Sequence, residues 1–334
     1  MNFTPVQMIG TQRSGSNLLR LMLNQLEGVS APHPPHILER FFPLLPAYGD
    51  LSIPGNFAKL VIDVCKLIEF NPVPWTGLKL DARAIISRCK RPLLTEIFRV
   101  IYEMRAESEH ASIWICKSLV NIRFADQLEE NGMTPLYIHL YRDGRDVALS
   151  FKKAIVGEKH IYHIAKQWKE EQDASLQLAE KIGSSRLLKV RYEDLLHNPV
   201  KELKKICSFI GAEYNPVAMD YYHSEESHKT ALSGVMWENV EKPVITDNYN
   251  KFKKELTPED ILLFEQVAGD TLVKLGYQLT FPNNNFQVFT PEDIRTFNEL
   301  NSTLKKEARL KQKPGDIEKR RRQEELIKNI KVLL

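Results

Sequence analysis

The chain of 334 residues is 43% hydrophobic and 27% charged, which is the composition of an ordinary soluble globular protein. A formal net charge of +3 is too small to indicate nucleic-acid binding, and no apolar run approaches the roughly 20 residues of a membrane span. The four cysteines form no C-x-x-C pair, which favours reduced thiols and a cytoplasmic location.

The first predicted elements are a buried strand over residues 6–9, a polar turn over residues 10–16 and a helix over residues 18–26. A strand, a glycine-containing loop and a helix in this order direct backbone N–H groups and the positive end of the helix at one point. We therefore expect a phosphate group to bind in front of this helix.

The loop has the glycine spacing of a P-loop but lacks its cation. Gly10 and Gly15 fit G-x-x-x-x-G-K-[ST], whereas Ser16 and Asn17 stand where Lys and Ser/Thr would be. The long cation of the loop is instead Arg13. This pattern indicates phosphate recognition for a reaction that needs no magnesium.

Further along the chain, strands alternate with helices. Strands are predicted over residues 75–80, 112–117, 136–141 and 187–191. Helices are predicted over residues 36–47, 56–70, 93–104, 121–130 and 161–181, and from Asn198 to Gly211. The alternation predicts an α/β fold: a P-loop-like, doubly wound, mainly parallel sheet flanked by helices.

Cationic and aromatic residues follow the predicted strands. Arg13, Lys117, Arg142 and Tyr192 all lie at or just beyond strand ends. In open α/β sheets, ligands bind at the carboxyl ends of the strands. We therefore expect these four residues to share one site.

The pattern loosens after residue 220. Residues 224–250 are expected to form a loop, followed by a helix over residues 258–275 and a break at residues 282–285. Two charged helices, 290–310 and 316–333, complete the chain. We predict a main domain over residues 1–282 and a helical C-terminal extension over residues 283–334, with Lys319 to Arg322 as a solvated helix face.

The segment Thr11–Asn17 (TQRSGSN) resembles the 5′-phosphosulfate loop of the sulfotransferases that use 3′-phosphoadenosine 5′-phosphosulfate (PAPS). It is closest in form to the T-x-R-S-G-[ST]-x loop of bacterial and tyrosylprotein sulfotransferases. The resemblance implies that PAPS is the co-substrate and that its 5′-phosphosulfate is bound by Arg13, Ser14, Gly15, Ser16, Asn17 and Leu18.

Three further segments resemble motifs of the same family, in the same order. Tyr141–Ser150 is similar to the 3′-phosphate motif, which implies that Arg142 and Ser150 bind that group. The segment from Arg191 to Pro199 implies that Tyr192 contacts the adenine.

The fourth segment, Lys242-Pro243 with residues 250–256, resembles a K-P…K-W-x-x-x-L element in which a cation closes on the 3′-phosphate. This implies a role for Lys242, although Phe252 replaces the Trp. The resemblance covers roughly residues 5–280.

Sulfuryl transfer needs cations at the leaving phosphate and a base for the acceptor hydroxyl. Arg13 and Lys117 are the candidate cations. Leu119 stands where the cytosolic small-molecule enzymes carry their catalytic His, so we look for the base after the first helix. His33 is our first candidate because its ordinary pKa suits the task, and His36 and Glu39 remain open.

We therefore expect a sulfotransferase that acts on a hydroxyl of a small molecule such as a lipid, sterol or aromatic alcohol, with no metal and no nucleic-acid partner. Its oligomeric state is left open, a homo-oligomer included. The segments 36–105 and 220–250 would supply the acceptor pocket, and its apolar lining could come from Phe41, Phe42, Tyr48, Phe57, Trp75 and Trp237.

Two other classes of function are compatible with the same residues. The first is a P-loop-like small-molecule kinase, in which Asp143 would hold a metal. The second is a non-catalytic nucleotide-binding or scaffold protein that acts through the charged C-terminal helices.

Overall fold

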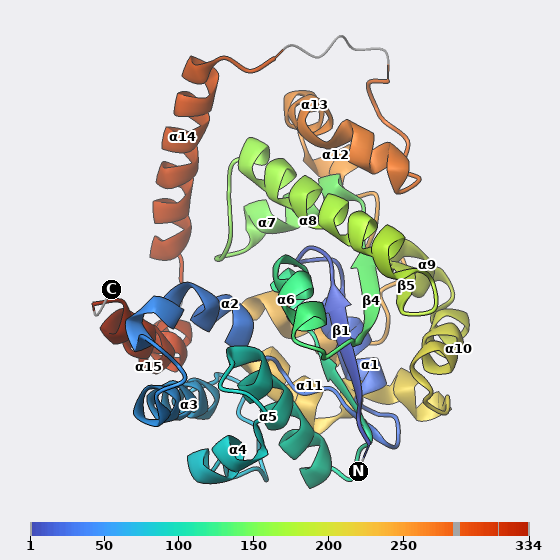
Figure 1. Ribbon diagram of the computed structural model, residues 1–334. Coiled ribbons are helices and arrows are strands. Elements are labelled where there is room, and N and C mark those ends of the chain that lie inside the picture. Colours follow the sequence, from blue (N-terminus) through green and yellow to red (C-terminus); the bar gives the residue numbers. More distant parts are fainter. Residues whose placement is uncertain (1, 283–287, 313, 333–334) are drawn as a thin grey trace.

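The computed structural model describes residues 2–282, 288–312 and 314–332, and its centre is a five-stranded parallel sheet (Figure 1). In the order β2-β3-β1-β4-β5, the strands are Val29–Ser30, Ile113–Cys116, Thr4–Ile9, Leu136–Tyr141 and Leu187–Arg191. From β1 the chain runs first to β2 and β3 on one side and later to β4 and β5 on the other. This reversal leaves a crevice at the carboxyl ends of β1 and β4.

Helices cover both faces of the sheet. The helices up to β3 are α1 (Ser16–Leu23), α2 (Ile37–Phe41), α3 (Pro54–Glu69), α4 (Ala82–Arg88) and α5 (Leu94–Ser108). They are followed by α6 (Ala125–Glu130), α7 (Gly144–Lys153), α8 (Ile161–Ile182), α9 (Tyr192–His197), α10 (Pro199–Ile210), α11 (Glu225–Leu232), α12 (Phe252–Glu255) and α13 (Pro258–Lys274). The 3₁₀ segments are η1 (Phe42–Tyr48), η2 (Leu119–Phe124), η3 (Pro216–His223) and η4 (Val235–Glu241).

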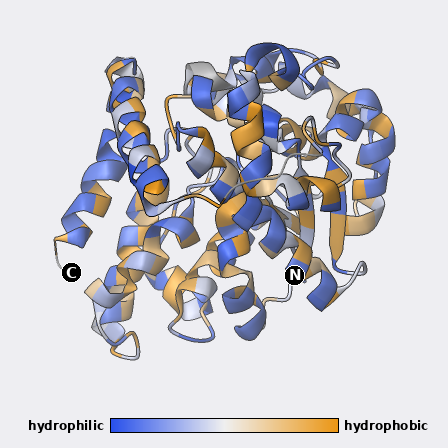
Figure 2. Ribbon diagram, turned by 90° about the horizontal axis from the view of Figure 1, so that it is seen from above, coloured by the Kyte–Doolittle hydropathy of each residue, from blue (hydrophilic) through white to orange (hydrophobic). Residues whose placement is uncertain are grey.

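The central strand is apolar on both sides because helices bury both faces. Val6 and Met8 of β1 belong to a core cluster with α1 and α10, whereas Ile9 packs toward α6 and α8. Successive side chains of a strand point to opposite faces, so both faces receive apolar residues. Gln7, which lies between Val6 and Met8, is polar and buried, and its Oε1 accepts a hydrogen bond from Asn121 Nδ2 at 3.1 Å. Figure 2 shows the resulting mixture of hydrophobic inner and hydrophilic outer surfaces along the helices.

The α/β fold and four of the strands predicted from the sequence are confirmed. The prediction of a strand over residues 75–80 is wrong. Trp75 is buried there and its indole donates a hydrogen bond to the carbonyl oxygen of His33 at 2.7 Å, so the segment serves as irregular packing beside residues 31–36. The two-residue strand β2 was not predicted, because two residues carry no periodicity.

Two predicted helices are divided and one predicted loop is helical. Residues 36–47 form α2 and then η1, which contains Pro43 and Pro46; without their N–H groups an α-helical ladder cannot continue. Residues 121–130 are likewise shared by η2 and α6. The prediction of a loop over residues 224–250 is wrong, since Ser224 caps α11 and η4 follows it.

The C-terminal helices α14 (Pro291–Leu310) and α15 (Pro314–Lys331) return to the body of the molecule (Figure 1). The side-chain oxygen of Asn301 accepts hydrogen bonds from the backbone N–H groups of Lys159 and His160, which precede α8. Gln323 donates to the carbonyl oxygen of Leu67 in α3. In the run predicted as a solvated face, Lys319, Arg321 and Arg322 are exposed and Arg320 is half-buried.

The four cysteines are free thiols, and Cys65, Cys116 and Cys207 are buried, as the sequence predicted. Among the described residues, no helix combines the length and the apolar character needed to cross a membrane.

The loop after β1 passes so close to β4 at Gly10 that a side chain there is expected to destabilise the fold. Its φ is +130°, and an added Cβ would lie 2.3 Å from the carbonyl oxygen of Leu140 in β4. We expect Gly10→Ala to lower the free energy of unfolding by about 2–5 kcal/mol, because backbone strain and overpacking add. Gly183→Ala is the control, since Gly183 also has positive φ but nothing lies near its Cβ; about 1 kcal/mol is expected. Equal losses in urea unfolding would contradict this explanation.

Candidate functional site

The loop after β1 ends in a helix whose first amides are open. Gly15 is the N-cap of α1 with φ +86°, and no side chain caps the helix. Arg13 also has a positive φ, +72°. The first N–H groups of a helix lack acceptors within it, so the amides of Ser16, Asn17 and Leu18 face the crevice as donors for an anion.

The loop and the segment after β4 are joined by direct hydrogen bonds. Arg13 Nε donates to Ser150 Oγ of α7 at 3.0 Å, and Arg142 Nη1 donates to the carbonyl oxygen of Arg13 at 3.3 Å. Burial and then the charge of Arg142 lower the pKa of Arg13. Two guanidinium groups of like charge thus share one crevice, where an anion would relieve their repulsion.

Tyr192 holds the loop against Arg142. A Cβ on Gly15 would lie 2.3 Å from the Tyr192 ring, so only a glycine fits beneath it. The Arg142 guanidinium lies over the same ring, 4.7 Å from its centroid. The Tyr192 hydroxyl accepts a hydrogen bond from Asn248 Nδ2 at 2.8 Å.

The segment from 242 to 252 covers this cluster. The carbonyl oxygen of Asn248 accepts from Arg142 Nη2 at 3.0 Å, and the Asp146 carboxylate accepts from the backbone N–H groups of Asn250 and Phe252. The structure does not bring Lys242 into the crevice: its side chain is exposed, and its carbonyl oxygen accepts from Tyr221. The cation from this segment that lines the cavity is Lys251.

Lys117 stands at the end of β3 beside the helix N-terminus. Its ammonium donates to Asn17 Oδ1 at 3.0 Å. Burial, followed by the charge of Arg20, lowers the pKa of Lys117 to about 7. The amine can therefore change its charge near neutral pH and would gain a proton next to an anion.

The three candidate bases differ in their surroundings. His33 is 5% exposed, and neither ring nitrogen has a hydrogen-bond partner among the described residues. Burial, followed by the charges of Lys117 and Arg20, lowers the pKa of His33 well below 6.5, so the imidazole is neutral at pH 7.

The other two candidates are bonded to neighbours. His36 Nδ1 lies 3.1 Å from Ser118 Oγ and 3.3 Å from Glu39 Oε2. Burial lowers the pKa of His36; burial raises that of Glu39, but the hydrogen bond and charge of His36 leave it lowered. His36 also occupies the N-cap position of α2 with a left-handed backbone. Of the three, His33 has the ring nitrogens with no partner.

These residues line one cavity of about 910 Å³. It is bounded on the loop side by Arg13, Gly15, Ser16, Asn17, Leu18, Lys117, Arg142, Ser150 and Tyr192. Ser14 is buried behind the loop, and no described residue bonds its hydroxyl. The opposite side is formed by His33, His36, Glu39, Trp237 and residues 153–156, together with Lys311, Arg320, Gln323 and Glu324 from the C-terminal helices.

The prediction that six aromatic residues line an apolar pocket is largely wrong. Trp237 lines the cavity, but Phe41, Tyr48, Phe57 and Trp75 belong to the core cluster over α3 and α5. Phe42 stacks on Phe124, with ring centroids 4.6 Å apart. A large aromatic side chain on the apolar face of a helix can be buried in the core or can line a pocket. Sequence patterns do not distinguish the two positions.

Asp143 does not take the metal-binding position that a kinase would require. It is buried and caps α7, and its carboxylate binds Arg145 Nε and Nη2 at 2.9 and 2.7 Å. Arg145 also pairs with Glu265. Within the described ranges, no three His, Cys, Asp or Glu side chains are grouped so that they could hold a metal ion.

Sequence reasoning missed three residues that organise the site, namely Arg20, Asp146 and Asn248. Arg20 is fully buried in α1, pairs with Glu226 at 2.8 Å, and donates to the Ala31 carbonyl oxygen beside the His33 segment. Its place among the leucines of an apolar helix face was a usable signal, since a buried charge needs partners. Asp146 and Asn248 gave no such signal.

Comparisons with known proteins agree with this geometry. The model described as the sulfotransferase family matches residues 5–216. The sulfotransferase domain from the Synechococcus PCC 7002 olefin synthase has a TM-score of 0.55 and 20% identity, over 83% of this chain and 96% of that one. The sulfotransferase domain from the curacin biosynthetic pathway has a TM-score of 0.52 and 20% identity, over 84% and 99%. A search of curated proteins finds no match.

Proposed function

Since the chain belongs to the sulfotransferase family, we propose that it transfers the sulfuryl group of PAPS to a hydroxyl of a small-molecule acceptor. The observation that carries the proposal is the meeting of Arg13, Arg142, Ser150 and Tyr192 in one crevice. PAPS carries anions at both its 5′ and 3′ positions, so its recognition needs two neighbouring cationic pockets. A cytoplasmic location and the lack of a metal requirement stay predictions from the sequence.

The residues present are suited to this nucleotide. The open amides of α1, with Arg13 and Ser14, would hold the 5′-phosphosulfate, and Arg142 with Ser150 would hold the 3′-phosphate. Arg142 lines the cavity, and its Nε is a buried polar atom without a partner among the described residues, which supports a ligand at this place. Contact of Tyr192 with the adenine, and any role of Lys242, remain part of the proposal.

The transfer itself requires a base and a cation. As the acceptor oxygen bonds to sulfur, the bond between sulfur and the 5′-phosphate oxygen breaks, and the acceptor proton passes to a base. We assign that base to neutral His33, whose ring nitrogens are buried without a partner among the described residues; one carries a proton and the other can accept one. Arg13 and Lys117 would stabilise the charge on the departing phosphate.

The donor assignment is tested by calorimetric titration with 3′-phosphoadenosine 5′-phosphate (PAP), ADP and ATP. We expect PAP to bind at least about 10-fold more tightly than ADP, because hydrogen bonds to charged groups contribute about 1.5–3 kcal/mol. Arg142→Ala should remove most of this preference and change the ADP affinity little. Equal affinities of the wild type for PAP and ADP would refute the donor assignment, and preference for ATP would favour the kinase.

The lowered pKa of Lys117 predicts that PAP binding is coupled to proton uptake. Its pKa of about 7 in the free protein means that the amine is mostly uncharged at pH 8. Bound PAP should raise this pKa by charge attraction, so binding at pH 8 should take up close to one proton through this group, and binding at pH 6 should take up little. The buffer dependence of the binding enthalpy measures this uptake. Lys117→Met should abolish it; undiminished uptake in the variant would assign the proton elsewhere.

The base is tested by comparing three alanine variants in an assay of PAP release with an acceptor panel. His33→Ala should lower kcat by about 10²–10⁴-fold while leaving the affinity for PAP unchanged, as expected for loss of a general base. His36→Ala and Glu39→Ala are the matched variants and should lose less than about 10-fold. A larger loss in Glu39→Ala than in His33→Ala would transfer the role to the carboxylate.

A further inference from the structure

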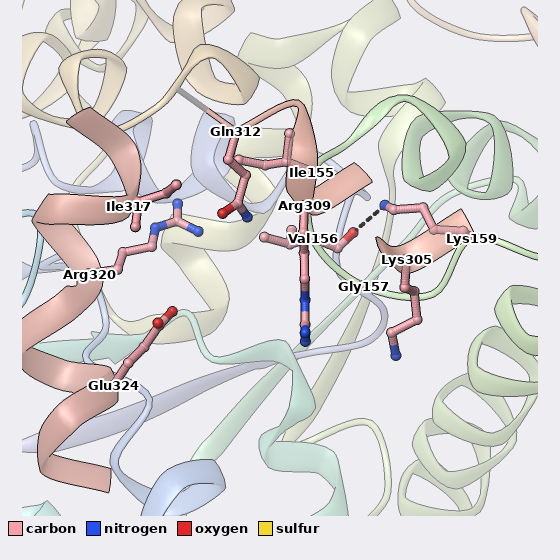
Figure 3. A pocket seen from close by; sticks show the side chains of 10 residues that line it. All are labelled: Ile155, Val156, Gly157, Lys159, Lys305, Arg309, Gln312, Ile317, Arg320 and Glu324. Atoms are coloured by element: carbon pink, nitrogen blue, oxygen red, sulfur yellow. Dashed lines mark hydrogen bonds between the residues drawn. The ribbon is translucent and has the colours of Figure 1, made fainter. Parts of the chain in front are cut away.

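A second, smaller cavity adjoins the crevice on the side of the C-terminal helices. It measures about 300 Å³ and lies between residues 155–159, the end of α14 and the first turns of α15 (Figure 3). Its lining comprises Ile155, Val156, Gly157, Lys159, Lys305, Arg309, Gln312, Ile317, Arg320 and Glu324. Ile155, Val156, Arg320 and Glu324 also line the crevice, whereas Lys305, Arg309, Gln312 and Ile317 line only the small cavity.

The walls of this cavity are firmly held. The Lys159 ammonium donates to three backbone carbonyl oxygens, those of Phe151, Ala154 and Val156, at 2.6–2.8 Å. These bonds shape the connection between α7 and α8. Asn301 of α14 binds the backbone of the same connection, so α14 and residues 154–160 form one unit.

The charge of the cavity is predominantly positive. Lys159, Lys305, Arg309 and Arg320 face a single carboxylate in the lining, that of Glu324. The Lys159 ammonium already donates three hydrogen bonds to backbone carbonyl oxygens, and Lys305 forms an ion pair with Glu158 at 3.0 Å. The Arg309 side chain makes no hydrogen bond or ion pair with any described residue, although its carbonyl oxygen accepts from Gln312 N–H, and Figure 3 shows its guanidinium reaching into the cavity. Its planar group of donors suits a carboxylate or phosphate.

The small cavity adjoins the crevice through shared lining residues. Ile155, Val156, Arg320 and Glu324 line both. The Arg320 guanidinium lies over the Trp237 ring, 5.6 Å from its centroid, and the Trp237 ring lies 5.5 Å from that of His33. Trp237, Ile155 and Val156 therefore provide apolar surface between the surroundings of the candidate base and the cavity that Arg309 lines.

We propose that the small cavity binds an anionic group of the acceptor, a carboxylate or a phosphate, while the acceptor hydroxyl lies at His33. The inference rests on the proposed sulfuryl transfer and names its substrate class: an elongated molecule with a hydroxyl at one end, an apolar body and an anion at the other. A neutral alcohol or sterol would leave the charge of Arg309 unmatched.

The test is calorimetric titration of the full chain, saturated with PAP, with 8-hydroxyoctanoate and with the neutral 1,8-octanediol. Because PAP fills the nucleotide pockets, the carboxylate can report only on another site. We expect the acid to bind at least about 10-fold more tightly than the diol. Arg309→Gln should remove this preference by weakening binding of the acid alone.

Arg295→Gln is the matched control. Arg295 is another exposed arginine of α14, paired with Glu292 at 3.2 Å and absent from the cavity lining. This variant should retain the wild-type preference. Equal binding of acid and diol to the wild type, or the same loss in both variants, would overturn the inference.

The two proposals fail in distinguishable ways. Absence of PAP binding would defeat the donor assignment, whereas normal PAP binding with no preference for the acid would defeat only the anionic acceptor. When the acid and diol titrations are repeated without PAP, the carboxylate can also bind at Arg13 and Arg142, so the informative result there is a loss of acid affinity in Arg309→Gln and not in Arg295→Gln. Unfolding in urea confirms that Arg309→Gln and Arg295→Gln are folded.

Discussion

Two guanidinium groups of like charge, Arg13 and Arg142, are held together in a crevice at the carboxyl ends of two neighbouring parallel strands. Their proximity is unfavourable by itself and depends on fixed partners: Arg142 donates to the Arg13 carbonyl oxygen, and Arg13 donates to Ser150. The Tyr192 ring lies between the loop glycine and Arg142. The fold thus stabilises a positive site before any ligand arrives, which is the preorganisation that anion recognition requires.

The positive charges of this crevice also lower the pKa values of the titratable groups near them. Burial and neighbouring cations lower the pKa of Lys117 to about 7 and keep His33 neutral. A neutral imidazole can accept a proton, and an amine near its pKa can adapt its charge to an incoming anion. The distribution of charge therefore leaves His33 in the form that can accept a proton, while burial and the neighbouring cations disfavour the imidazolium that would result.

The C-terminal helices take part in the body of the molecule. Asn301 accepts hydrogen bonds from the backbone just before α8, Gln323 bonds to α3, and Ile330 is buried in the core cluster that includes α3 and α5. Helix α15 also supplies Arg320, Gln323 and Glu324 to the cavity. These helices lie outside residues 5–216, which the family model matches.

The sequence by itself determined the α/β class, the order of the motifs that resemble those of sulfotransferases, and their places at strand ends, because hydrophobic periodicity and short glycine-containing loops are local properties. It could not separate core aromatic residues from pocket residues, and so Phe41 and Trp75 were misplaced. Nor could it find Asn248, Asp146 or Arg309, whose roles arise from partners more than a hundred residues away or from a cavity between distant helices. Only the tertiary structure decided these, since contact between remote segments depends on how whole helices pack.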